Sequence, residues 1–261
     1  MDLGRGRRRG RRTAVVLRAA LGSATVLAAL LAAPPAFAQA ALACGRFSPD
    51  VLAAPEPREA SAPVRRFELI KEWVRTQPYR ALFLGDSLTE RWDPELWRQH
   101  MAPRGVLNAG VSGDRTEHLR WRLDHGNLAG LPPRLAIVEI GTNDLGHGRP
   151  PDVAAEGVRD VLLKLRERLP DTRILLLGLW PRSATEEDRL RREVREVNRM
   201  IATCGDNKTV FYADIGGVLL DRRGELSRAI SPDLLHFSAI GYARLAPALD
   251  RLIDPLLAMS R

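Results

Sequence analysis

The sequence predicts an α/β fold built on a parallel sheet, and three observations support this prediction. From residue 64 onward, short apolar runs alternate with amphipathic stretches, which is the pattern of consecutive βαβ units. The apolar runs, such as residues 135–140, contain few polar residues, as strands covered on both faces do. About 200 residues carry this pattern, which is enough for one domain with a full hydrophobic core.

The individual elements follow from the same pattern. Strand-like runs span residues 80–84, 105–108, 135–140, 173–178 and 210–213. Helix-like stretches span residues 64–75, 116–123, 153–169, 186–203 and 239–257. Asp152 and Ser238 suit the N-caps of two of these helices. Pro247 lies inside the last helix, and we expect it to kink or split that helix.

The N-terminal residues 1–38 are typical of a secretory signal peptide. A basic region that ends at Arg12 or Arg18 is followed by an apolar stretch over residues 19–33, then by Ala36-Phe37-Ala38, a pattern that signal peptidases cleave. The apolar stretch is shorter than the ~20 residues that a membrane span needs. We expect cleavage after Ala38 and export to the periplasm or the medium, with an uncleaved anchor as the alternative.

The segment 39–63 is rich in alanine and proline and is predicted to be a leader or linker before a domain at residues 64–261. Residues 41–44 also resemble a lipoprotein cleavage box, with the leucine one place late, so lipidation of Cys44 is a second alternative. The other cysteine is Cys204. The two either pair in an oxidising compartment or remain free, and two cysteines alone leave both possibilities open.

The charge of the chain argues against a nucleic-acid partner. The formal net charge is +8, but residues 1–38 hold seven of the 40 basic residues and one of the 32 acidic residues, which leaves 33 and 31 in the rest. A basic face that could neutralise phosphates is therefore not expected. The five histidines are scattered, no Cys/His cluster has the spacing of metal ligands, and neither a metal nor a cofactor is expected.

Four short motifs carry the candidate chemistry. The first three each follow a strand-like run, and the fourth precedes the last helix; they are Gly85-Asp86-Ser87-Leu88, Ser112-Gly113-Asp114, Gly141-Thr142-Asn143-Asp144 and Asp233-Leu234-Leu235-His236. Because the carboxyl ends of parallel strands meet at one edge of the sheet, the first three motifs should converge there.

Together the motifs supply the groups that ester hydrolysis requires. Ser87 is a candidate nucleophile that needs a nearby base, and His236 with Asp233 three residues before it can supply that base if both lie on one helical turn. The N–H groups of Ser87 and Gly113 and the side-chain amide of Asn143 are candidate oxyanion donors. Each residue alone also suits a plain structural role as a helix cap, a glycine turn, an Asx turn or a surface charge.

The ordered set resembles the SGNH (GDSL-type) hydrolase family. The resemblance covers about residues 64–257, and its longer motifs are similar to the branch that contains the catalytic subunits of intracellular platelet-activating-factor acetylhydrolase. Those motifs are residues 84–88, 108–114, 119–123, 141–143 and 177–182.

The resemblance implies a three-layer α/β sandwich with a five-stranded parallel sheet in flavodoxin-like order and an open active site. It implies that Ser87 is the nucleophile, that His236 is the base with Asp233 as its partner, and that Ser87, Gly113 and Asn143 form the oxyanion hole. It also implies that the aspartate next to the nucleophile is structural.

From these features we expect a serine esterase that cleaves short-chain esters, above all acetyl esters, with an acylated carbohydrate, a short-chain ester or a lysolipid as its small-molecule substrate. A lysophospholipase or thioesterase for longer chains, and a non-catalytic carbohydrate- or lipid-binding module, are the alternatives. Candidate substrate-binding residues, which suit core packing equally well, are Leu88, Trp180, Leu234 and Leu235. Arg149 and Arg182 either steer anionic substrates or are solvated charges.

Overall fold

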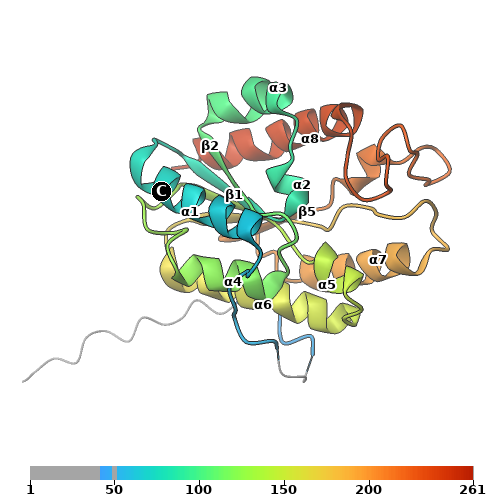
Figure 1. Ribbon diagram of the computed structural model, residues 1–261, viewed down its shortest axis with the longest axis horizontal. Coiled ribbons are helices and arrows are strands. Elements are labelled where there is room, and N and C mark those ends of the chain that lie inside the picture. The colour runs from blue at the N-terminus through green and yellow to red at the C-terminus, as the bar shows by residue number, and fades with distance from the viewer. Residues whose placement is uncertain (1–41, 49–51, 261) are drawn as a thin grey trace, which may run out of the picture. The chain divides into compact units, whose positions relative to one another are not determined.

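The computed structural model describes residues 42–48 and 52–260, and the predicted signal peptide lies outside the described residues (Figure 1). Five parallel strands form one sheet in the order β2-β1-β3-β4-β5, so the predicted flavodoxin-like sheet is confirmed. The strands are β1 (Ala81–Gly85), β2 (Val106–Gly110), β3 (Leu135–Glu139), β4 (Arg173–Leu177) and β5 (Val210–Ala213).

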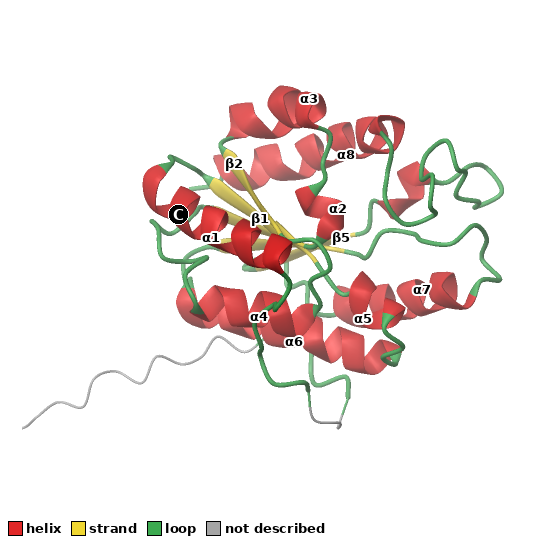
Figure 2. Cartoon of the chain, viewed as in Figure 1, coloured by secondary structure: helices red, strands yellow, loops and turns green. Residues whose placement is uncertain are grey.

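Helices cover both faces of the sheet and complete three layers (Figure 2). One core cluster joins the sheet to α1 (Ser61–Thr76), α4 (Thr116–Asp124), α6 (Pro151–Arg168) and α7 (Arg189–Ala202). The opposite cluster joins it to α8 (Ala239–Ala258). Alternation along β1 produces the two clusters, because Leu82 packs into the first and Phe83 into the second.

Two features of the helices differ from the prediction, and one agrees with it. α6 begins at Pro151 with Pro150 at its N-cap, so Asp152 lies in the first turn and is not the cap; a proline near the start of a helix has no N–H to leave unpaired. α8 runs as one helix through Pro247 and Pro255, so the expected split does not occur. Ser238 is the N-cap of α8, as predicted, and accepts a hydrogen bond from Gly241 N.

Beyond a short helical turn at Ser87, the sequence pattern did not indicate the helical segment between β1 and β2. It consists of α2 (Ser87–Glu90), α3 (Pro94–Leu96), a π-helical turn (Trp97–Met101) and a 3-10 turn (Ala102–Arg104). A further 3-10 turn, Gly216–Leu219, follows β5, and the short helix α5 (Thr142–Gly146) follows β3. Trp92 and Met101 are buried in the cluster beneath α8, so this segment forms part of the layer on that face.

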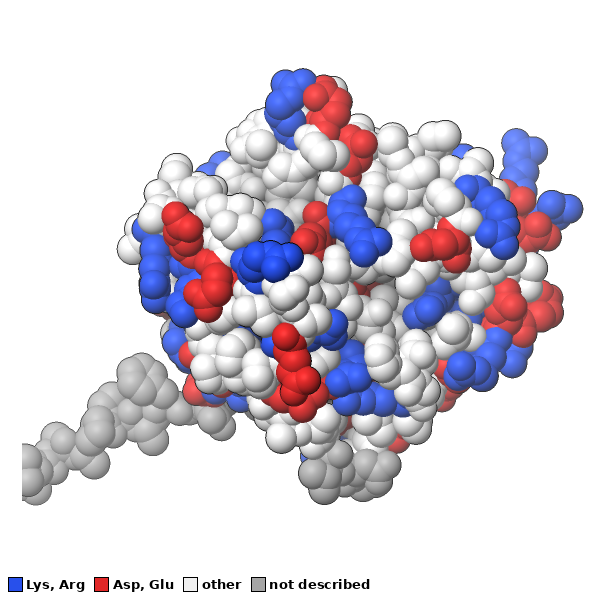
Figure 3. Space-filling view, in the orientation of Figure 1, with Lys and Arg blue, Asp and Glu red and all other residues white. Residues whose placement is uncertain are grey.

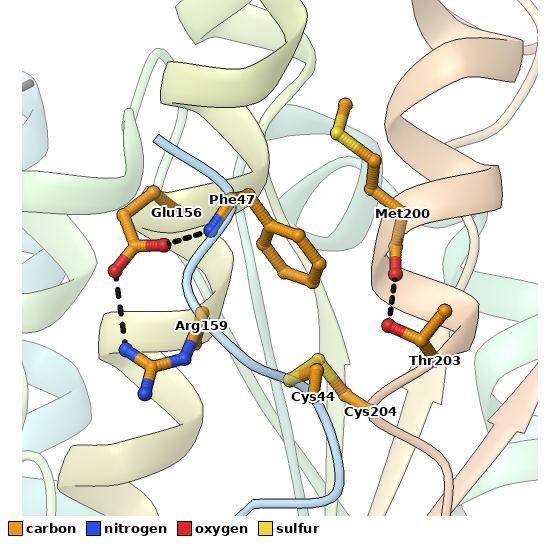
Figure 4. The surroundings of a disulfide bond; sticks show 7 residues. All are labelled: Cys44, Phe47, Glu156, Arg159, Met200, Thr203 and Cys204. Carbon is orange, nitrogen blue, oxygen red and sulfur yellow. Dashed lines mark hydrogen bonds and ion pairs between the residues drawn. A yellow bond between two sulfur atoms is a disulfide. The ribbon is translucent and has the colours of Figure 1, made fainter. Parts of the chain in front are cut away.

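The segment before α1 packs on the domain instead of leading away from it. Its described residues, 42–48 and 52–60, contain no helix or strand and are here called the strap. Cys44 in the strap forms a disulfide with Cys204, which follows α7, across 160 residues of sequence (Figure 4). The pairing leaves no thiol at Cys44 for lipid attachment. The strap belongs to the same compact unit as the elements from α1 onward, whereas the sequence predicted a domain that begins at residue 64.

Charge is evenly distributed over the face in view. Lysines and arginines alternate with acidic side chains there, without a large patch of one sign (Figure 3). None of the helices within residues 42–48 and 52–260 combines the length and apolar character that crossing a bilayer requires.

Candidate active site

Ser87 stands where β1 ends and α2 begins. Asp86 caps this turn, because its Oδ1 accepts a hydrogen bond from Leu88 N at 2.8 Å. The turn lies so close to β2 that a Cβ on Gly110 would come within 2.4 Å of Glu90 N, a distance that only glycine tolerates. The tight packing fixes the position of Ser87, which is 5% exposed.

Ser87, His236 and Asp233 form a continuous hydrogen-bonded chain. Ser87 Oγ lies 2.9 Å from His236 Nε2, and His236 Nδ1 lies 2.7 Å from Asp233 Oδ2. In this arrangement Nδ1–H donates to the carboxylate and Nε2 is free to accept the serine proton. The side chains of His236 and Asp233 are 27% and 57% exposed, so this end of the hydrogen-bonded triad is accessible to solvent.

The pairing of Asp233 with His236 comes from a turn, not from the helical turn that the spacing suggested. Asp233 Oδ1 accepts hydrogen bonds from the backbone N–H groups of Leu235 and His236 at 3.0 and 2.7 Å, which is an Asx turn. Leu234 has φ of 61°, an unusual conformation for leucine. Burial would raise the pKa of Asp233, but hydrogen bonds from His236 and the two N–H groups lower the pKa to about 2.

The loop after β2 presents one amide without a partner. Ser112 N donates to Glu90 Oε2 at 2.6 Å, and Asp114 N donates to Val111 O at 3.1 Å. Gly113 lies between them with φ of 78°, and within the described part of the chain its N–H has no hydrogen-bond acceptor. This free N–H is what an oxyanion donor requires.

Asn143 reaches the same edge from the start of α5, but its amide is already engaged. Nδ2 donates to Asp114 O at 2.9 Å and to Asp86 Oδ2 at 3.1 Å. Both side-chain hydrogens are thereby used in this state. To donate to an oxyanion, Asn143 must exchange or share one of these bonds, a requirement that the sequence did not indicate.

Buried acids lie beneath the serine. Asp86 is fully buried, and the loss of solvent raises its pKa to about 7. Glu139 at the end of β3 is also fully buried, and burial together with the nearby Asp86 raises its pKa well above the ordinary value. The carboxyl group of Asp86 accepts hydrogen bonds from Leu88 N and Asn143 Nδ2 and from no atom of Ser87. These contacts agree with the structural role that the family resemblance implied.

The four candidate substrate-binding residues separate into two pairs. Leu88 and Trp180 are about 1% exposed and belong to the core cluster beneath α8, so they do not line the site. Trp180 is held there between Trp92 and Phe237. Leu234 and Leu235 are half-buried beside His236 and can contact a substrate.

Neither of the two candidate steering arginines is a free surface charge. Arg149 donates to both carboxylate oxygens of Glu117 at 2.6 and 2.7 Å and to Asp144 at 2.8 Å. Arg182 Nη1 donates to Thr142 O at 2.8 Å, and burial lowers its pKa. Both side chains fix the loop and helix that follow β3.

A cluster of possible metal ligands joins the strap to the start of α4. Ligand atoms of Glu56, Glu117 and His118 come within 4.8 Å of one another. Arg149 and Arg115 already donate to Glu117, and burial lowers the pKa of His118 to about 4. Arginine therefore supplies the positive charge that a metal would bring to this cluster.

Fold and site together define a class of protein: a hydrolase with a three-layer α/β fold, in which a serine, a histidine and an aspartate meet at the carboxyl edge of a flavodoxin-like sheet. The model of the GDSL-like lipase/acylhydrolase family matches residues 83–244. Platelet-activating factor acetylhydrolase IB subunit alpha1 of Homo sapiens is 35% identical over 184 residues, which is 69% of this chain and 78% of the relative.

Solved structures share the fold. A protein of Streptococcus pneumonia superposes with a TM-score of 0.65 at 23% identity, covering 74% of this chain and 92% of its own. An acetylxylan esterase from Geobacillus stearothermophilus superposes with a TM-score of 0.55 at 22% identity, covering 69% and 96%. The chain belongs to the GDSL-like lipase/acylhydrolase family and is a carboxylic ester hydrolase.

Proposed function

We propose that this protein is an exported serine esterase that hydrolyses short-chain esters, above all acetyl esters, through an acyl-serine intermediate. The observation that carries the proposal is the hydrogen-bonded chain from Ser87 Oγ through His236 to Asp233. A serine hydroxyl becomes an effective nucleophile when an oriented base is in contact with it.

The reaction follows from the geometry in two steps. Ser87 Oγ attacks the ester carbonyl while His236 Nε2 takes the hydroxyl proton; the tetrahedral intermediate then collapses as His236 returns that proton to the leaving alcohol. Water, deprotonated by His236, attacks the acyl-serine. The second tetrahedral intermediate then breaks its bond to Ser87 Oγ, which takes the proton back from His236 as the acid is released. The negative oxygen of each intermediate is held by the N–H groups of Ser87 and Gly113 and by Asn143 after exchange of one of its bonds.

The preference for short acyl groups is supported by the exposure of the site and by relatives. The partly exposed His236 and Asp233 place the reacting groups near solvent, which suits a small acyl group on a larger alcohol. The names of the human relative and of the Geobacillus structure specify an acetylhydrolase and an acetylxylan esterase.

Export is supported by the predicted signal peptide and by the Cys44–Cys204 disulfide. Disulfides of this kind persist in oxidising compartments and are rare in the cytosol. Mass spectrometry of the protein recovered from the producing cells tests this part, because a mature N-terminus at Gln39 is expected and retention of residues 1–38 would contradict it.

Hydrolysis of p-nitrophenyl esters from C2 to C12, by the wild type and by Ser87→Ala, tests the activity. We expect the rate to be highest at C2–C4 and to vanish in the variant. A maximum at C8–C12 would support a lysophospholipase or thioesterase instead. Full activity in Ser87→Ala would exclude the acyl-serine mechanism.

A further inference from the structure

The strap connects a remote disulfide to the loop that carries Gly113. At its start, Cys44 is bonded to Cys204, and Phe47 N donates to Glu156 Oε2 at 2.7 Å. Figure 4 shows this part of the strap passing between α6 and the end of α7, with Glu156 also bound by Arg159. Further along, the strap residue Glu56 pairs with Arg115 at 3.3 Å.

Arg58, in the second half of the strap, contacts Gly113 directly. Its Nη1 donates to Gly113 O at 2.7 Å. The guanidinium also covers the α-carbon, since a Cβ on Gly113 would lie 3.0 Å from Arg58 Nη2. Among residues 42–48 and 52–260, Gly113 O accepts no other hydrogen bond, and Arg58 has no carboxylate within ion-pair distance.

The Gly113 carbonyl and the Gly113 N–H belong to two successive peptide groups, which are joined by the backbone torsions of Gly113. Gly113 has φ of 78°, and glycine rotates freely into other conformations unless something holds it. Glu90 fixes Ser112 N, and Val111 O fixes Asp114 N. Arg58, at Gly113 O, and Val111 O, at Asp114 N, hold the peptide group that follows Gly113 from both of its ends. The peptide group that carries the unpartnered Gly113 N–H lies between this held group and the one fixed by Glu90, so its direction depends on both neighbours staying in place.

We propose that Arg58 is a positioning residue for the oxyanion hole, and that the Cys44–Cys204 disulfide anchors the strap that places it. The inference rests on the proposed function, in which Gly113 N–H stabilises the oxyanion. Arg58 acts through Gly113 and does not contact the reacting atoms. Its contribution is to keep a flexible glycine in the conformation that catalysis needs, and it is largest in the transition state, where the oxyanion is fully formed.

Steady-state kinetics of Arg58→Ala on p-nitrophenyl acetate test the catalytic effect. We expect kcat to fall about 10-fold with little change in KM, which is less than the ~10²–10³ lost when a donor is removed outright. A boronic acid, which forms a tetrahedral adduct with serine, should lose affinity for the variant by a similar factor. Arg58→Lys should recover part of both losses.

The matched control is Arg46→Ala, which removes another strap arginine, one that is 60% exposed and pairs with Glu156. It should leave kcat and boronic-acid affinity unchanged. Equal kcat and equal boronic-acid affinity in Arg58→Ala and the wild type would overturn the proposal.

Amide hydrogen exchange separates a failure of this inference from a failure of the proposed function. Exchange at residues 111–115 should be faster in Arg58→Ala than in the wild type and in Arg46→Ala, whether or not any ester is hydrolysed. Unchanged exchange would show that Arg58 does not hold the loop. Faster exchange without Ser87-dependent hydrolysis in any protein would instead refute the esterase.

A double-mutant cycle that combines removal of the disulfide with Arg58→Ala tests the role of the disulfide. Cys44→Ser/Cys204→Ser should lower kcat in the wild-type background and have little further effect in the Arg58→Ala background, since both changes release the same contact. Independent, multiplicative losses would show that the disulfide does not act through Arg58. Thermal unfolding midpoints measured alongside identify any variant that is partly unfolded at the assay temperature.

Discussion

The carboxylate of Asp233 both orients the catalytic imidazole and closes the turn that presents it. Oδ2 meets His236 Nδ1, and Oδ1 accepts the backbone N–H groups of Leu235 and His236. In Asp233→Asn, Oδ1 can still close the turn, but an amide no longer stabilises the imidazolium. We therefore expect kcat to fall about 10³–10⁴-fold, while the circular dichroism spectrum stays native. A loss of less than tenfold would show that His236 acts without this partner.

The same carboxylate predicts an effect of acid on folding. Its folded pKa of about 2 lies below the ordinary value of an unfolded aspartate. The stabilisation from Asp233 is therefore fully present above about pH 4 and is lost as the pH falls towards 2. Urea unfolding of the wild type and of Asp233→Asn should show a stability difference at pH 5 that shrinks below pH 4. A difference that stays constant with pH would contradict the shift.

The buried carboxyl of Glu139 predicts that folding stability falls as the pH rises, which is the opposite of the pH dependence expected from Asp233. Its folded pKa is raised by burial and by Asp86, so the unfolded chain releases a proton above about pH 4 that the folded chain retains. Wild-type stability should then fall as the pH rises, by about 1 kcal/mol per pH unit until the folded group ionises. Glu139→Gln removes this cost, so the variant should match the wild type near pH 4 and unfold at a higher temperature near pH 7.

The control for Glu139 is Glu68→Gln. Glu68 is 57% exposed, and its replacement should not change the slope of the unfolding midpoint against pH. If Glu139→Gln is no more stable than the wild type at pH 7, the carboxyl is not buried in its neutral form.

At the scale of elements, the contact between α2 and β2 decides where the nucleophile stands. Gly110 leaves room for the backbone of Glu90, which a Cβ would approach to 2.4 Å. Gly110→Ala should push α2 and Ser87 away from His236. We expect kcat to fall about 10²-fold, because a shift near 1 Å has that effect, with about 1–3 kcal/mol lost from stability.

Gly217→Ala is the matched control for Gly110→Ala. A Cβ at Gly217 meets nothing within 4 Å, so kcat and the unfolding midpoint should stay within error of the wild type. If Gly110→Ala behaves in the same way, α2 is more mobile than the close approach implies.

Elements that depend on residues near one another in sequence could be predicted from the sequence. Features that depend on contacts between residues far apart in sequence could not. The strands and their order follow from apolar runs and from a family resemblance, and Ser238 caps α8 through an interaction three residues away. The engagement of Asn143 by Asp86 and Asp114 depends on where three loops meet. Arg58 was missed because its contact with Gly113 spans 55 residues and lies in a segment without regular structure.

For the whole molecule, the Cys44–Cys204 disulfide is the longest-range covalent constraint within the described residues. It closes a loop over 160 residues, and such a cross-link stabilises a fold by about 2–5 kcal/mol, mainly by restricting the unfolded chain. Cys44→Ser/Cys204→Ser should lower the free energy of unfolding by this amount in urea titrations. A reducing agent should lower the wild type to the same value and leave the variant unchanged.

The disulfide also sets the order of events during biosynthesis. With two cysteines in the sequence, Cys44 can form one intramolecular bridge, so an oxidant suffices and no isomerase is needed to correct wrong pairs. Synthesis proceeds from the N-terminus, at about 5–20 residues per second, and Cys44 must remain a reduced thiol until Cys204 has also emerged. During that interval the open thiol can react with thiols of other proteins, and pairing with Cys204 ends this exposure.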